Sequence, residues 1–145
     1  RAFNMGISDS ARKVYAEYDR EIAGQLGVHG PRKDYREGLR FEREEIVLED
    51  ARQVLDSIVA DYPDRSIVAK IDCEGSEYEI VGALAAAGKL RLLEAIMMEW
   101  HVRKPEHDPA TLASLLCDAG FRVFLLQPHS RTGGMLYAVR GNRFP

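Results

Sequence analysis

The sequence predicts an α/β domain whose sheet is mostly parallel and ends in an antiparallel pair of strands. From residue 46 onward, apolar runs of strand length alternate with amphipathic stretches of helix length. Strands that alternate with helices are typical of parallel sheets covered by helices, whereas no helix separates the last two apolar runs. The chain has 145 residues and shows no internal repeat, so we expect one domain over residues 1–145.

The boundaries of the expected elements follow from hydrophobic periodicity and from glycine, proline and capping residues. Strands are expected at residues 1–7, 13–18, 39–48, 67–71, 92–99, 121–126 and 135–139. Helices are expected at residues 49–61, 76–87 and 109–119, and residues 22–36 are expected to form a loop. Asp108 is expected to cap the last helix, with Pro109 at its first position.

Composition and charge predict a folded, soluble protein. Hydrophobic residues make up 46% of the chain and charged residues 30%, which is typical of globular domains. The net charge of −3 predicts no nucleic-acid partner, because nucleic-acid binders usually carry a basic patch. We find neither a signal peptide nor a membrane-length apolar run, and expect no membrane partner and a cytoplasmic location. Cys73 and Cys117 are expected to be buried free thiols.

The strongest functional signal follows the expected strand at residues 67–71. Asp72 and Glu74 come directly after this strand, and they share a face if the chain stays extended. Gly75 then permits a tight turn into a helix, because glycine adopts backbone angles that are closed to other residues. Ligands bind outside the carboxyl ends of strands in open α/β sheets, so Asp72 and Glu74 are candidate catalytic residues.

Three further residues of this stretch are expected to serve the helix itself. Ser76 and Glu79 form the pattern of a capping box, in which the two side chains bond backbone amides of the first turn. Glu77 and Glu79 lie where the helix dipole favours negative charge. We therefore interpret both glutamates as capping and solubilising groups.

A second pair of candidates lies at the end of the expected strand at residues 92–99. Glu99 and His101 are alternate residues and would share a face. Because parallel strands end at the same edge of a sheet, this pair is expected to approach Asp72 and Glu74. His101 has an ordinary pKa near neutrality and could act as a general base, but a histidine at a strand end is equally compatible with a structural role.

Signals for metal or phosphate binding are weaker. Glu106, His107 and Asp108 offer ligand atoms, but their spacing matches no compact metal motif, and Asp108 is explained as a helix cap. The sequence contains no nucleophile elbow, no Walker motif and no dinucleotide-binding glycine motif. We therefore predict no metal site.

Four segments of the sequence together resemble a known family. They are KIDCEGSE at residues 70–77, AIMMEWH at residues 95–101, NMGISD at residues 4–9 and IVLED at residues 46–50. In the same order, they are similar to four stretches of the FkbM-type methyltransferases. Those stretches are the K-I-D-x-E-G-x-E signature, a next strand ending in Glu-x-His, an N-x-A-I-S-D stretch and a short T-L-D-D segment. Gly6 replaces the alanine of the third stretch, and the Thr and first Asp of the fourth are also replaced.

This resemblance, which spans nearly the whole chain, implies a Rossmann-like class I methyltransferase fold. The family binds S-adenosylmethionine and typically methylates a hydroxyl oxygen, here of a small molecule or sugar. The resemblance implies that Asp72 lies beside the cofactor and the reacting centre. It also implies that Glu74, Glu99 and His101 face the acceptor.

The resemblance further implies that Gly6, Ile7 and Ser8 bind the cofactor near its adenine. The family's first strand, with its Asp-x-Gly-Ala-Asn loop, and the acidic strand that holds the ribose would lie N-terminal to Arg1. We therefore expect the chain to be the C-terminal portion of such a domain, without tight cofactor binding of its own. The strand at residues 67–71 would then have an open apolar edge, which predicts a homo-oligomer, a domain swap or an edge covered by another segment.

Two other functions stay open on the sequence. A domain without the cofactor strands could be a non-catalytic oligomerisation or binding module. A metal-dependent hydrolase that uses Asp72, Glu74, Glu99 and His101 is less favoured, because the acids cluster without the spacing of a ligand motif. A metal-dependent activity that does not respond to S-adenosylmethionine would favour the hydrolase.

Overall fold

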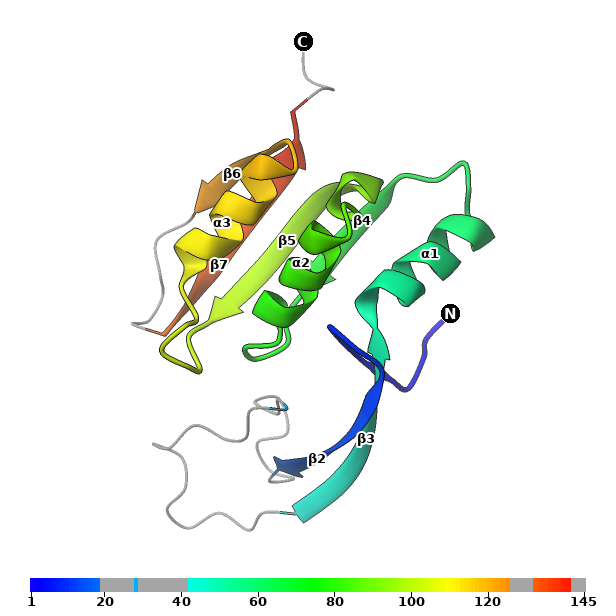
Figure 1. The fold of residues 1–145 in the computed structure, drawn as a ribbon, viewed down its shortest axis with the longest axis vertical. Coiled ribbons are helices and arrows are strands. Elements are labelled where there is room, and N and C mark those ends of the chain that lie inside the picture. Colours follow the sequence, from blue (N-terminus) through cyan, green and yellow to red (C-terminus); the bar gives the residue numbers. More distant parts are fainter. Residues whose placement is uncertain (19–27, 29–41, 126–131, 142–145) are drawn as a thin grey trace.

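The computed structural model describes residues 1–18, 28, 42–125 and 132–141, which form an α/β fold with two sheets and three helices (Figure 1). The strands are β1 (Gly6–Ser8), β2 (Arg12–Tyr18), β3 (Glu42–Asp50), β4 (Ile67–Ile71), β5 (Leu93–His101), β6 (Phe121–Leu125) and β7 (Gly133–Arg140). The helices are α1 (Ala51–Asp61), α2 (Glu77–Ala86) and α3 (Pro109–Asp118), with a 3₁₀ turn at Leu90–Leu92. The loop predicted at residues 22–36 lies outside the described residues except at residue 28. In the described part of the chain, no helix is long and apolar enough to cross a membrane.

The larger sheet has the strand order β4-β5-β7-β6. β4 and β5 are parallel, whereas β7 pairs antiparallel with both β5 and β6. β4, β5 and β6 therefore run in one direction, and the last two strands form the predicted antiparallel pair. Because β7 returns between β5 and β6, the larger sheet is mixed, and the prediction of a mostly parallel sheet is wrong for the pairing of its strands. Of the three hydrogen-bonded pairs between its described strands, one is parallel.

The alternation of strands and helices also places β3 in the main sheet, and this expectation is wrong. β3 lies in a smaller sheet of order β1-β3-β2, where it is parallel to β1 and antiparallel to β2. Its first four residues, which run from Glu42 to Glu45, are all charged and exposed. A central strand of a parallel sheet is buried on both faces, so this charged half favours a position in a solvated antiparallel pair.

Helices α2 and α3 lie over one face of the larger sheet, and α1 lies beside α2 (Figure 1). The core between these helices and the sheet contains fully buried side chains from four elements, namely Val81, Met98, Leu112, Leu116 and Leu136. Each such side chain contributes roughly 1.5–3 kcal/mol relative to an exposed one. On β4 and β6, in contrast, Val68 and Phe124 are 66% and 56% exposed.

Side-chain caps begin two of the helices. Asp108 accepts a hydrogen bond from the backbone N of Ala110 at 3.0 Å, and Pro109 follows it, as predicted. At the start of α1, Asp50 accepts from the backbone N of Arg52 at 2.8 Å. The hydrogen bond from the Arg52 guanidinium lowers the pKa of Asp50 to about 2. These caps satisfy amides that a helix leaves without an internal partner.

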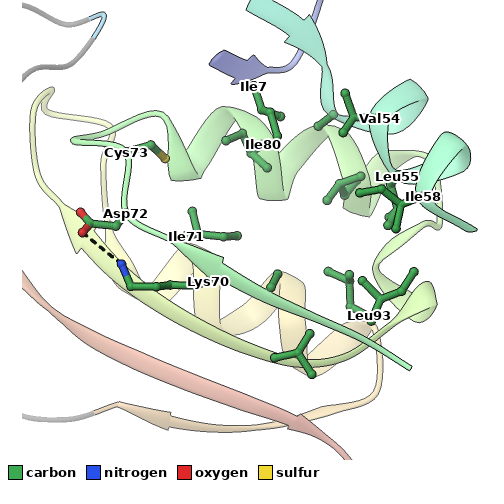
Figure 2. Close-up of a pocket in the computed structure, with 15 residues that line it drawn as sticks. Ile7, Val54, Leu55, Ile58, Lys70, Ile71, Asp72, Cys73, Ile80 and Leu93 are labelled. Atoms are coloured by element: carbon green, nitrogen blue, oxygen red, sulfur yellow. Dashed lines mark hydrogen bonds and ion pairs between the residues drawn. The ribbon is translucent and has the colours of Figure 1, made fainter. Parts of the chain in front are cut away.

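β4 forms one edge of the larger sheet within the described residues. A groove of about 440 Å³ lies beside this edge, between β4 and the helices α1 and α2 (Figure 2). Its lining is mostly apolar and includes Ile7, Leu55, Ile71 and Ile80. Asp72 is part of this lining where β4 ends. The open apolar edge expected from the sequence is therefore present in this part of the chain.

We expect a charged residue on this edge to weaken self-association of the chain. Lysine on an edge strand opposes pairing with a further strand, and Val68 on β4 offers an exposed position for it. The unaltered chain is expected to scatter light as a homo-oligomer, and Val68→Lys is expected to shift it towards the monomer. Val47→Lys on β3, where the side chain is 43% exposed, is the matched control. A monomeric unaltered chain would contradict the expectation.

Candidate functional site

The chain leaves β4 at Asp72 and enters α2 through a tight turn. Glu74 and Gly75 both have positive φ, at +53° and +110°. The backbone N of Ser76 donates to the carbonyl oxygen of Cys73 at 3.2 Å. The turn predicted from Gly75 is thus confirmed, but the extended chain assumed for Asp72 to Glu74 ends at Glu74. A non-glycine residue in this backbone region is uncommon, and such residues cluster at functional turns.

Asp72, Glu99 and His101 come together at the carboxyl ends of β4 and β5. One ligand-type atom from each of the three lies within 4.8 Å of the others. The His101 residue is 2% exposed, whereas the side chains of Asp72 and Glu99 are 43% and 32% exposed. The site therefore combines one buried imidazole with two partly exposed carboxylates. Lys70 pairs with Asp72 at 3.4 Å on its exposed side (Figure 2).

Glu74 joins this cluster, but Arg103, which the sequence reasoning did not single out, holds it in place. The Glu74 carboxylate pairs with the Arg103 guanidinium, and Arg103 Nε also donates to the Glu74 carbonyl oxygen at 3.2 Å. The Arg103 side chain is 7% exposed, so solvent ions screen this pair less than a surface pair. Glu74 Oε1 lies 3.7 Å from His101 Nε2. A basic residue just beyond the strand end was the signal available in the sequence.

Glu77 is a central residue of the site, and its interpretation as a solubilising cap is wrong. Its side chain is fully buried and accepts hydrogen bonds from the backbone N of Gly75 at 2.8 Å and of His101 at 2.5 Å. Its Oε1 atom also lies 3.3 Å from His101 Nδ1. Glu77 shares the buried face of α2 with Ile80 and Leu84, at helical spacing. That spacing was the sequence signal for its burial.

The predicted capping box is absent. Ser76 has helical backbone angles, φ −77° and ψ −7°, and its side chain makes no capping hydrogen bond. Glu79 instead accepts from Ser8 Oγ at 2.9 Å and from the Arg12 guanidinium at 3.2 Å. These contacts tie α2 to the smaller sheet. The backbone N–H of Gly75 in the turn donates its hydrogen bond to the Glu77 carboxylate.

The three residues expected near the adenine form β1. Ile7 lines the same groove as Asp72. Ser8 is fully buried, and its hydroxyl donates a hydrogen bond to the Glu79 carboxylate. A Cβ atom at Gly6 would meet the Leu48 side chain, so packing against β3 favours glycine there. Of the three, Ile7 is the residue that the structure brings to a cavity with Asp72.

Cys73, Cys117 and Trp100 lie in the surroundings expected of residues with a structural rather than a catalytic role. Burial raises the pKa of the Cys73 thiol well above its ordinary value, and the nearby Glu77 carboxylate acts in the same direction. Cys117 is exposed, so its predicted burial is wrong; α3 turns Leu112 and Leu116 to the core instead. Trp100 is 6% exposed and belongs to the core.

Glu77 and His101 hold each other in their charged forms. Burial disfavours the charge on His101, but the contact with Glu77 and the charges of Glu74, Glu77 and Glu99 outweigh it, and its pKa is raised. Burial likewise opposes the charge on Glu77, but hydrogen bonds from His101 and from backbone amides, including that of Gly75, leave its pKa lowered. His101 therefore becomes a proton acceptor above its raised pKa rather than near the value of a free imidazole.

In metal-free buffer, this pair is expected to stabilise the fold most between about pH 4.5 and 6.5. The lowered pKa of Glu77 gives stability that is complete above its ordinary value of 4.5 and is lost as pH falls through the lowered pKa. The raised pKa of His101 gives stability that is complete below 6.5 and is lost as pH rises through the raised pKa. Urea unfolding across pH, with Glu77→Gln as the comparison, measures this contribution. A pH profile that Glu77→Gln leaves unchanged would contradict it.

Comparison with known proteins gives no relative from which a role could be transferred. No family model matches the chain, and no curated protein and no solved structure matches it significantly. The motifs of the sequence and the geometry of the strand-end cluster are therefore the features that indicate a function.

Proposed function

We propose that the chain is part of an S-adenosylmethionine-dependent O-methyltransferase with a Rossmann-like class I sheet. Its acceptor would be a hydroxyl of a small molecule or sugar. The observation that carries the proposal is the meeting of Asp72, Glu99 and His101 at the ends of adjacent parallel strands. These residues belong to two of the four segments that resemble FkbM-type methyltransferases. A sheet whose last strand is reversed is compatible with this fold class.

The described residues fit one side of such a site. The carboxylates and the imidazole can orient an acceptor hydroxyl, and the groove beside β4 brings Ile7 to Asp72. The groove is mostly apolar and offers few partners for a ribose or an amino-acid group. We therefore assign these residues to the acceptor side and to one wall of the cofactor site. The remaining cofactor contacts would come from the two further strands that the resemblance implies.

In this proposal, the residues of the chain position the acceptor oxygen and take its proton. S-adenosylmethionine, when bound, supplies a methyl group whose bond to a sulfonium sulfur breaks as the bond to oxygen forms, and a neutral thioether leaves. Asp72 or His101 receives the hydroxyl proton, and Glu99 helps to orient the hydroxyl. Glu77 lies beside the imidazole, with Oε1 at 3.3 Å from Nδ1, and would limit its rotation. Positioning and proton transfer are the contributions that such a displacement needs from a protein.

Transfer of a labelled methyl group tests this function. The longer product that the resemblance implies would be incubated with methyl-labelled S-adenosylmethionine and a panel of hydroxylated sugars and small molecules. We expect the label in a methyl ether of at least one acceptor, identified by mass spectrometry. Label that stays in the cofactor with every acceptor would count against the proposal.

The strand-end cluster also favours a second candidate, a metal-dependent hydrolase. Two carboxylates and one imidazole that meet at a partly open site are a donor set that metallohydrolases use. Hydrolysis of p-nitrophenyl acetate or p-nitrophenyl phosphate that depends on Mn²⁺ and ignores S-adenosylmethionine would favour this candidate. A non-catalytic binding module, favoured by the open edge of β4, would show neither activity.

A further inference from the structure

The imidazole of His101 directs Nε2 at carboxylates without a hydrogen bond to either. The residue is 2% exposed, and Nε2 lies 3.6 Å from Glu99 Oε1 and 3.7 Å from Glu74 Oε1. Both distances exceed the length of a hydrogen bond between nitrogen and oxygen. The buried ring nitrogen of His101 that has no hydrogen-bond partner is Nδ1, on the side of Glu77, whereas Nε2 is the nitrogen that faces the carboxylates. The position calls for a group that can bridge the nitrogen and the carboxylates.

A divalent cation meets this requirement. The ligand-type atoms of Asp72, Glu99 and His101 all lie within 4.8 Å of one another. A metal ion binds nitrogen and oxygen donors at roughly 2.0–2.2 Å, so donors on one ion lie about 3–4 Å apart. Small rotations of the two partly exposed carboxylates would close the difference, while the buried imidazole stays in place. Donors from two strands converge here, which explains why no compact spacing appears in the sequence.

The second observation is the buried carboxylate behind the imidazole. Glu77 is fully buried, with its Oε1 atom 3.3 Å from His101 Nδ1 and backbone amides of Gly75 and His101 holding it. Metal-bound histidines almost always direct their second nitrogen at a carboxylate, a carbonyl or a water. Nδ1 makes no hydrogen bond in the structure, but its position beside Glu77 leaves Nε2 as the nitrogen that faces the cluster. A solvated capping residue would not explain this arrangement.

The neighbouring charges define which carboxylates bind the ion. The buried Arg103 holds Glu74, so we leave Glu74 outside the set of ligands. Lys70 pairs with Asp72, but its side chain is 65% exposed and can turn to solvent when an ion replaces it. The mixed nitrogen and carboxylate donors suit manganese, iron or zinc better than magnesium or calcium, which prefer oxygen alone.

We propose that Asp72, Glu99 and His101 form a binding site for a divalent transition-metal ion, with Glu77 orienting the imidazole. Three protein ligands leave further positions of the ion open to water or to an oxygen of a substrate. The proposal concerns binding by the chain itself, and in the ion-bound form Nε2 of His101 is a ligand rather than a proton acceptor. It does not depend on methyl transfer, so a failure to bind cofactor and a failure to bind metal are separate results.

The test is a titration of the chelator-treated chain with Mn²⁺ and with Zn²⁺, without cofactor or acceptor. We expect one ion per chain by calorimetry. Asp72→Asn and Glu99→Gln are each expected to weaken binding at least tenfold, and Glu77→Gln roughly 10- to 100-fold, as for other residues that orient a metal ligand. Asp64→Asn, an exposed acid in the turn before β4, is the matched control and is expected to bind like the unaltered chain.

A spectroscopic measurement identifies the nitrogen ligand without a variant at the buried histidine. In ¹⁵N spectra of the imidazoles, Zn²⁺ is expected to shift Nε2 of His101 far more than Nδ1. Circular dichroism of each variant separates lost ligation from lost folding. Absence of binding, equal binding by folded Asp72→Asn, or an unmoved Nε2 signal would each overturn the proposal.

Discussion

Replacing Glu77 with alanine is expected to destabilise the fold by about 3–5 kcal/mol. The backbone N–H groups of Gly75 and His101 would each lose their acceptor, at roughly 1–3 kcal/mol for each buried group left without a partner. The imidazole of His101 would lose its nearest carboxylate, and a cavity would form in a fully buried position. Because domains of this size are stable by about 5–15 kcal/mol, this loss is a large share of the total.

Urea unfolding followed by circular dichroism measures the effect of Glu77→Ala. Glu77→Gln keeps the shape and one acceptor, and we expect it to lose less than the alanine variant. Glu106→Ala is the control, because that glutamate is exposed. If Glu77→Ala were as stable as Glu106→Ala, the network around Glu77 would not hold the turn and the end of β5 as described.

Replacing Asp72 with asparagine is expected to abolish methyl transfer and to leave the fold nearly unchanged. A positioned acid or base contributes roughly 10²- to 10⁴-fold to a rate, and Asp72 lies at the end of β4 beside both the groove and His101. Its side chain is 43% exposed, and its ion pair with the exposed Lys70 is worth about 0–1 kcal/mol. Activity and stability should therefore separate in this variant.

Labelled methyl transfer and urea unfolding are to be measured on the same preparation of Asp72→Asn. Asp64→Asn makes the same chemical change at an exposed position and is expected to keep full activity. An equal loss of activity and stability in Asp72→Asn would make Asp72 a structural residue. Full activity in a folded Asp72→Asn would remove it from the catalytic group.

Much of the local structure could be predicted because it depends on neighbours in the chain. The apolar run of β4 ends at the predicted residue, and the Asp108-Pro109 pair begins α3 as expected. The direction of β4, β5 and β6 follows from the helices between them. The local sequence pattern could not predict which sheet contains β3. Its pairing with β1 and β2 is decided by contacts between residues far apart in the chain.

In the candidate site, too, some residues could be predicted from the sequence and others could not. Asp72, Glu99 and His101 could be placed together because residues at the ends of parallel strands share an edge. The sequence suggests the wrong role for Glu77, because a glutamate in a first helical turn is ordinarily explained by the helix dipole, whereas its position on the apolar stripe of α2 indicates burial. The contact of Glu74 with Arg103 depends on how the chain continues after β5. Tertiary packing determines the course of the chain after β5, so this contact could not be predicted from the local sequence.

The central claim is that these residues belong to a methyltransferase whose cofactor is S-adenosylmethionine. The most direct test is calorimetric titration of the cofactor into this chain and, in parallel, into the longer product that the resemblance implies. The account predicts binding by the longer product and none of useful affinity by this chain alone. Tight binding by this chain alone would contradict the assignment of most cofactor contacts to an upstream segment. Absence of binding by both proteins would contradict the methyltransferase account itself.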